Sequence, residues 1–197
     1  MIATMASCVR YLTHPQVQID AAVPVPEWRL SLVGRARAQK LAEAGWLRAT
    51  TRIVSSGERK AMETADILAR AIGQSFVVRE NMHENDRSAT GFLPPAEFET
   101  VADQFFGQPE ISIRGWERAI DAQARIMREV EAALLPKHVG DVLFVGHGAV
   151  GTLLYCHLAG LPISRKHDQP VGGGNIFAFE HASHRVQHAW RSIEELT

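Results

Sequence analysis

The chain has 197 residues, of which 46% are hydrophobic and 22% are charged. This length fits one domain, and the apolar fraction is sufficient for a complete core. The formal net charge is only −1, with both signs interspersed along the chain. Such a balance provides no general field for nucleic acid or for an anionic membrane, so an anionic ligand would need local cationic groups. We therefore expect one domain over residues 1–197 and neither a nucleic-acid nor a membrane partner.

In chain order, short apolar runs alternate with helical periods. The expected strands are 8–13, 52–54, 75–78, 142–146, 175–179 and 185–187. The expected helices are 31–47, 55–72, 116–135 and 149–158. Ser31 is placed to cap the first helix, and Ser55 with Glu58 is placed to form a capping box for the second. The alternation predicts a three-layer α/β sandwich with a mostly parallel sheet and a closing hairpin.

The periodicity changes between residues 81 and 115, where several glycines and prolines surround one short amphipathic helix. We interpret this stretch as a cap or lid that crosses the active edge of the sheet. The two cysteines, Cys8 and Cys156, lie inside apolar runs and lack metal-ligand spacing. Together with an apolar start too short to span a bilayer, they predict a cytoplasmic protein with reduced thiols.

Two histidines that are far apart in the chain each follow a predicted strand. His14 comes after the first strand, and His147 comes after the strand at 142–146. Because the carboxyl ends of parallel strands share one edge of a sheet, the two imidazoles are expected to meet there. Imidazole is both a nucleophile and a proton carrier near neutral pH. The pair therefore predicts a catalytic site at this edge.

Four segments in order resemble the histidine phosphatase superfamily, the phosphoglycerate-mutase-like enzymes. They are Thr13-His14-Pro15, the run from Ser55 to Ala65, Met82-His83-Glu84 and Val145-Gly146-His147-Gly148. The resemblance covers nearly the whole chain and implies the phosphoglycerate-mutase-like fold. It also implies phosphomonoester hydrolysis through a phosphohistidine, on a phosphorylated small molecule, with no metal and no organic cofactor.

The resemblance assigns a role to each matching residue. His14 would accept the phosphoryl group, His147 and Lys60 would stabilise its oxygens, and Glu84 would protonate the leaving alcohol. Each role fits the chemistry of phosphoryl transfer, which needs an in-line nucleophile, fixed positive donors and an acid. The short insert favours hydrolysis over mutase action, although a mutase-type phosphotransferase is an alternative.

The sequence departs from the family pattern at the residues that bind phosphate. Thr13 and Pro15 replace the arginine and glycine that flank the first histidine in the family, and Lys60 replaces a second arginine. Lysine holds phosphate as a point charge and lacks the bidentate fork of arginine. A family asparagine aligns at Asp20, whose charge would repel phosphate if it pointed inward. These losses favour a second hypothesis, a divergent relative that binds an anion or a protein without catalysis.

Other residues are candidates for the missing contacts. We expect phosphate contacts from Gly148, which follows His147, and from one or more of three arginines: Arg10, Arg59 and Arg87. Arg10 lies four residues before His14, on the same face of the strand. The run Gly146 to Gly151 matches a dinucleotide fingerprint, but no second strand with an acidic end follows it. We expect no metal site, including at the histidines near the C-terminus.

Overall fold

The computed structural model describes residues 7–135 and 140–196. Six strands form one sheet in the order β3-β2-β4-β1-β5-β6. Their bounds are β1 Cys8–Thr13, β2 Thr50–Ser56, β3 Phe76–Arg79, β4 Asp141–Gly146, β5 Asn175–Glu180 and β6 Val186–Ser192. Strands β1 to β4 pair in parallel, while β5 runs antiparallel to both β1 and β6. The predicted mostly parallel sheet with a closing hairpin is confirmed.

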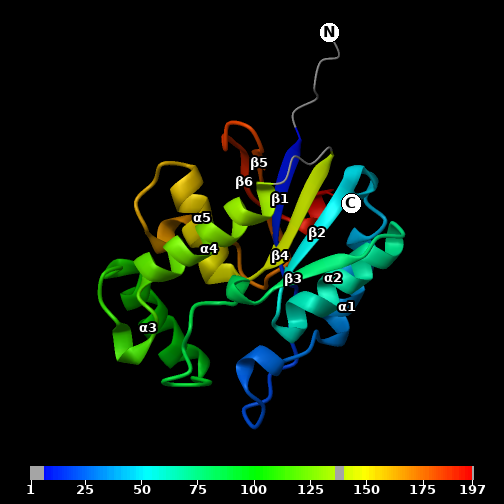
Figure 1. Ribbon diagram of the computed structural model, residues 1–197. Coiled ribbons are helices and arrows are strands. Elements are labelled where there is room, and N and C mark those ends of the chain that lie inside the picture. The colour runs from blue at the N-terminus through cyan, green and yellow to red at the C-terminus, as the bar shows by residue number, and fades with distance from the viewer. Residues whose placement is uncertain (1–6, 136–139, 197) are drawn as a thin grey trace.

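Helices cover both faces of this sheet, which gives the predicted three layers (Figure 1). The helices α1 and α2 lie on one face, and α4 and α5 lie on the other. Helix α3 extends beyond the sheet, next to the α4–α5 layer. The bounds are α1 Leu32–Leu41, α2 Arg59–Ala71, α3 Pro95–Gly107, α4 Ala119–Leu134 and α5 Gly148–Leu158.

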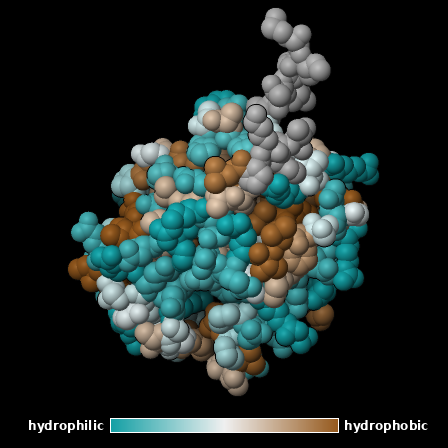
Figure 2. All heavy atoms as spheres, in the orientation of Figure 1, coloured by the Kyte–Doolittle hydropathy of each residue, from teal (hydrophilic) through white to brown (hydrophobic). Residues whose placement is uncertain are grey.

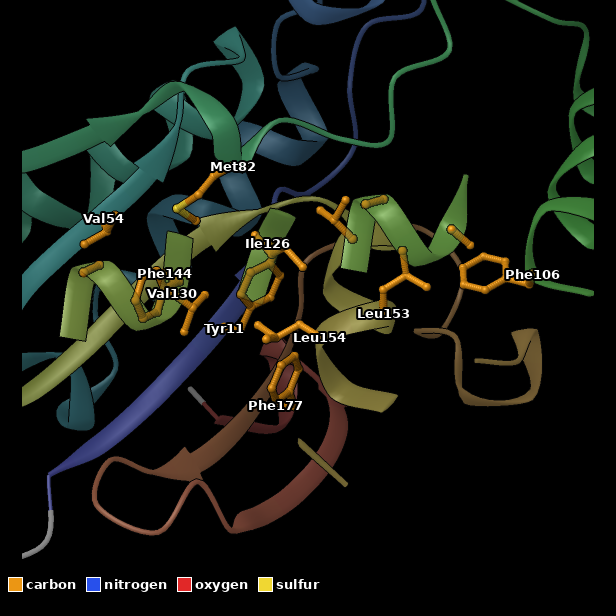
Figure 3. Close-up of a cluster of buried hydrophobic side chains, with 14 of the residues drawn as sticks. Tyr11, Val54, Met82, Phe106, Ile126, Val130, Phe144, Leu153, Leu154 and Phe177 are labelled. Atoms are coloured by element: carbon orange, nitrogen blue, oxygen red, sulfur yellow. The ribbon is translucent and has the colours of Figure 1, made fainter. Parts of the chain in front are cut away.

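The core consists of two apolar clusters, one on each face of the sheet. Successive residues of a strand point to opposite faces. Tyr11 and Phe144 therefore pack with Ile126 among the residues under α4 and α5 (Figure 3), whereas Leu12 and Leu143 pack under α1 and α2. These five side chains are fully buried. The central strands β1 and β4 are thus fixed from both sides, which holds the loops at their carboxyl ends in place.

The first two helices start differently from one another. Ser31 caps α1 as predicted, because its Oγ accepts from the Gly34 N–H at 3.0 Å. The helix ends at Leu41 rather than near residue 47, and a 3₁₀ turn over Gly45–Ala49 follows it. The predicted capping box of Ser55 with Glu58 is wrong. Helix α2 begins at Arg59, Ser55 Oγ donates to the Ser56 carbonyl at 2.9 Å, and the Glu58 carboxylate makes other contacts.

The segments after β1 and β3 project beyond the same end of the sheet (Figure 1). They therefore frame the edge at which the parallel strands end. Figure 2 shows hydrophilic residues over most of the visible face, with hydrophobic residues in separate patches. Within the described ranges, no helix is long and apolar enough to cross a membrane.

Candidate active site

The two histidines meet at the carboxyl ends of adjacent strands. His14 follows β1, and His147 follows β4 as the N-cap residue of α5. Since β1 and β4 pair in parallel with Thr13 opposite Gly146, the next residue of each strand lies at the same height. The imidazole centroids are 5.3 Å apart, and the ring planes make an angle of 68°. The fold thus brings together two imidazoles that are distant in the sequence.

His14 has the form of a free nucleophile. Its Nδ1 lies 2.8 Å from the Pro15 carbonyl oxygen. A carbonyl only accepts, so Nδ1 carries the proton, and the lone pair of Nε2 is left available. Burial and the nearby Lys60 ammonium lower the pKa of His14 to about 4. At neutral pH the ring is therefore uncharged, as a nucleophilic imidazole must be.

His147 is fully buried and is held by three neighbours. Its Nε2 lies 2.8 Å from Ser56 Oγ and 3.6 Å from Glu58 Oε1, and its backbone N–H donates to Tyr11 Oη at 3.2 Å. Burial lowers the pKa of His147, while the Glu58 carboxylate acts in the opposite direction. In the described part of the chain, Nδ1 has no hydrogen-bond partner.

The Glu84 carboxylate lies at the start of α5. It accepts from the backbone N–H groups of Ala149 and Val150, at 3.1 and 3.0 Å. The amino end of a helix attracts a carboxylate, so the helix fixes the position of this side chain. Burial nevertheless raises the pKa of Glu84 above its ordinary value. A raised pKa brings a carboxyl group closer to the range in which it can donate a proton at neutral pH.

Glu58 is a buried carboxylate, although its spacing from Ser55 predicts a role in helix capping. The side chains of Lys60 and Glu58 are only 4% and 8% exposed, and they form an ion pair. Glu58 also accepts from the Glu84 N–H at 2.8 Å. Burial alone would raise the pKa of Glu58, but His147, Lys60 and this N–H hold it well below its usual range. No local pattern predicted this ion pair, because Glu58 is the N-cap residue of α2 and side chains two residues apart on a helix do not face each other.

Lys60 is close to the histidines but already has two partners. Besides Glu58, its Nζ donates to the Val25 carbonyl at 2.9 Å. An ammonium group has three N–H donors, so these two contacts leave one donor unused. The positive charge of the lysine lowers the pKa of both His14 and His147, because a nearby cation disfavours a second one. The cation expected from the sequence is thus present, although a carboxylate largely offsets its charge.

Two cavities meet at Glu84, Asn85 and Arg87. The first, of about 480 Å³, includes His14, Gly148 and Arg165 in its lining, and we call it the histidine cavity. The second, of about 920 Å³, includes Glu58 and the loop 21–27, and we call it the acidic cavity.

Two further candidates line the histidine cavity. Arg87 places its guanidinium 4.9 Å from the centroid of the Phe98 ring, and its charge lowers the pKa values of His14, His147 and Glu84. Gly148 also lines this cavity, and a Cβ there would lie 2.3 Å from Gln169 Nε2, so any side chain would displace the end of that glutamine. The structure thus brings both residues to the histidine edge.

Arg10 and Arg59 lie elsewhere. Arg10 donates to Asp141 Oδ2 at 2.7 Å and covers the Trp46 ring. Asp141 is the first residue of β4, so the Arg10 guanidinium lies toward the opposite end of the strands. Four steps along extended backbone, about 13 Å, separate Arg10 from His14. Arg59 pairs with Glu63 and lines a separate surface hollow. Neither guanidinium replaces the missing family arginine, which corrects both expectations.

Thr13, at the position of that arginine, has a structural role. It is 1% exposed, donates to Gln169 Oε1 at 2.6 Å and accepts from the Asn175 N–H at 3.0 Å. Asp20 is exposed and accepts from the Ala22 N–H, so its carboxylate stabilises a turn. Among the described residues, no group of three or more His, Cys, Asp or Glu side chains is placed to hold a metal ion.

The sequence model of the histidine phosphatase superfamily (branch 1) matches residues 18–192. The chain belongs to this superfamily. The matched range begins after His14 and includes Lys60, Glu84 and His147. No curated protein matches the sequence significantly.

Solved structures of superfamily members superpose over nearly the full chain. A mycobacterial glucosyl-3-phosphoglycerate phosphatase with inorganic phosphate is 24% identical, with 94% of this chain and 95% of that chain covered and a TM-score of 0.74. YhfR of Bacillus stearothermophilus is 20% identical, with 93% and 95% covered and a TM-score of 0.77. A phosphoserine phosphatase of Entamoeba histolytica in complex with 3-phosphoglyceric acid is 15% identical, with 97% and 100% covered and a TM-score of 0.76. These likenesses establish the phosphoglycerate-mutase-like fold.

Proposed function

We propose that this protein hydrolyses phosphomonoesters of small molecules through a phosphohistidine at His14. The observation that carries the proposal is the meeting of His14 and His147 at a centroid distance of 5.3 Å, beside a cavity that Glu84 also lines. Two of the structural relatives are phosphatases, which supports the same reaction class.

The first half-reaction uses His14 and Glu84. The Nε2 lone pair of His14 attacks phosphorus in line with the ester oxygen, and the P–O bond breaks as the P–N bond forms. The Glu84 carboxyl donates its proton to the departing alkoxide, so the alcohol leaves neutral. In the second half-reaction, the Glu84 carboxylate takes a proton from water, the water oxygen attacks phosphorus, and the P–N bond breaks. Phosphate and neutral His14 are regenerated.

The positive groups around the phosphoryl oxygens are His147, Lys60 and Arg87. An arriving dianion raises the pKa of His147, which favours the imidazolium that stabilises the transferring group. The backbone N–H groups at the start of α5 add donors beside Gly148. Each step is therefore carried by a group of this chain.

We also propose that the segment 81–115 is a cap on this site. Phe98 and Phe105 of α3 line the histidine cavity, and Arg165 ties α3 to the body through Glu99 and Asp103. The segment is then part of a single domain whose substrate enters beneath it. The two cysteines, Cys8 and Cys156, are free thiols, which supports a reducing compartment such as the cytoplasm.

The experiment is hydrolysis of an aryl phosphate by wild type and two variants. His14→Ala should abolish turnover, whereas Arg59→Met should retain it because Arg59 lies outside the site. One observation favours the non-catalytic alternative: the Lys60 ammonium is offset by Glu58. Absence of wild-type turnover on a broad ester panel, combined with measurable phosphate binding, would support that alternative.

A further inference from the structure

The acidic cavity lies beside the histidine cavity and has the wrong charge for a phosphate group. Its lining contains five carboxylates and one arginine, Arg87. The carboxylates are Glu27, Glu58, Glu80, Glu84 and Asp86. Glu58 is paired with Lys60, and Glu84 is held by N–H groups of α5, so the charge that would repel a phosphate dianion is the excess of Glu27, Glu80 and Asp86 over Arg87. The cavity is therefore suited to the alcohol part of a substrate and not to its phosphate.

Two of these carboxylates are open to a ligand. Glu27 and Glu80 are exposed, and neither forms an ion pair within the described ranges. The Glu80 carboxylate lies against the backbone of Gly57, where a Cβ would be only 2.1 Å from Oε2. The glycine thus lets this carboxylate approach the residue next to Glu58. Asp86 accepts from the Ser88 N–H at 2.9 Å and adds charge at the rim.

Asn85 supplies an independent sign of a ligand at the junction. It is 5% exposed and lines both cavities. Its Nδ2 is buried and has no hydrogen-bond partner among the residues that the structure describes. A buried amide donor without a partner costs free energy, so such a group is ordinarily completed by an acceptor. An ester or phosphoryl oxygen held between the two cavities would be that acceptor.

We propose that the acidic cavity is a subsite for a cationic group, and that the substrate is the phosphomonoester of an alcohol that carries an ammonium. This inference rests on the proposed function. The phosphoryl group lies at His14, the ester oxygen faces Glu84 and Asn85, and the ammonium lies among Glu27, Glu80 and Asp86. The arrangement also accounts for the missing phosphate-binding arginines, because an ester that carries its own ammonium needs fewer protein cations than an ester without one.

The test compares two esters of the same shape. One is choline phosphate, and the other is its neutral isostere, in which a carbon atom replaces the quaternary nitrogen. Wild type should show kcat/KM higher for choline phosphate by roughly tenfold, the effect of an ammonium a few ångströms from carboxylates in a partly solvated site. The ratio isolates the charge, because the phosphate and the leaving oxygen are shared.

Variants locate the source of the preference. Glu80→Gln and Glu27→Gln should each lower the ratio about threefold, and the double variant should lower it further, because each removes one carboxylate. Glu43→Gln is the matched control, since Glu43 is exposed and lies outside both cavities. Asn85→Ala should reduce kcat/KM for both esters alike and leave their ratio unchanged.

The outcomes separate this inference from the proposed function. Equal kcat/KM for the two esters, or a ratio that survives the double variant, overturns the subsite while hydrolysis stands. If wild type turns over neither these esters nor an aryl phosphate, the proposed function fails. In that case, the Kd values of the two esters for wild type are compared by calorimetry. A tenfold lower Kd for choline phosphate supports the subsite, and equal Kd values refute it.

Discussion

Replacing Glu58 with glutamine tests how this site binds phosphate. The change removes one buried negative charge and keeps the shape of the side chain. Glu58 Oε1 lies 3.6 Å from His147 Nε2, so its charge faces the space between the histidines. At about 6 Å, one such charge repels one unit of phosphate charge by about 3 kcal/mol at an effective dielectric constant of about 20.

Partial solvent access reduces this repulsion. We expect Glu58→Gln to tighten phosphate binding by about 1.5 to 2.5 kcal/mol, roughly tenfold to seventyfold in Kd. The same change leaves Lys60 buried without its ion-pair partner, which costs about 3 to 5 kcal/mol of stability. For a chain of this size, that cost lowers Tm by roughly 6 to 20 °C. Saturating phosphate should restore part of the loss, because it binds only the folded state.

The assay is calorimetric titration with phosphate, combined with thermal unfolding at several phosphate concentrations. Glu43→Gln serves as the control for loss of one acidic charge on the exposed surface. A double variant, Glu58→Gln with Lys60→Met, should regain stability and lose the tighter binding. Unchanged or weaker phosphate binding by Glu58→Gln would refute the claim that Glu58 offsets the lysine.

Three further predictions follow from the same geometry. Glu84→Gln should slow hydrolysis of alkyl esters at least tenfold more than that of aryl esters, whose leaving groups need no proton; equal slowing in a leaving-group series would contradict the acid role. The pKa of His14 is lowered to about 4, so the uncharged imidazole persists until the pH falls to about that value. Burst-phase phosphorylation should therefore remain at pH 5. A loss of the burst near pH 6.5, the ordinary pKa of histidine, would contradict the argument that burial lowers the pKa. Arg87→Met should weaken phosphate binding about tenfold, while the matched Arg59→Met should not change it; equal effects in titration would show that Arg87 does not face the anion.

The strands and helices that could be predicted are those with strong local patterns. Val142 to Gly146 forms a short apolar strand with His147 at its end, and the period from Ala61 to Ile72 is that of an amphipathic helix. Parallel pairing then places both histidines at one edge, so their meeting follows from topology. The end of α1 could not be predicted from the sequence, because the apolar positions continue past Leu41 into a 3₁₀ turn.

The predictions for the site that were wrong concern the contacts of charged side chains. Arg10 lies on the strand that precedes His14, but its salt bridge with Asp141 lies at the other end of the sheet. That partner is distant in sequence, and only the register of β1 with β4 brings it close. The sequence around Glu58 is compatible with a helix cap and equally with a buried ion pair. Its true contacts, with Lys60, His147 and the Glu84 N–H, depend on three segments meeting in space.

The most direct test of the central claim is to trap the covalent intermediate. Wild type is mixed with a radiolabelled aryl phosphate, quenched in base, where phosphohistidine survives, and mapped by peptide mass spectrometry. We predict label on His14 that forms and decays at rates compatible with turnover, and no label in His14→Ala. Label on another residue, or hydrolysis by His14→Ala at the wild-type rate, would contradict the account.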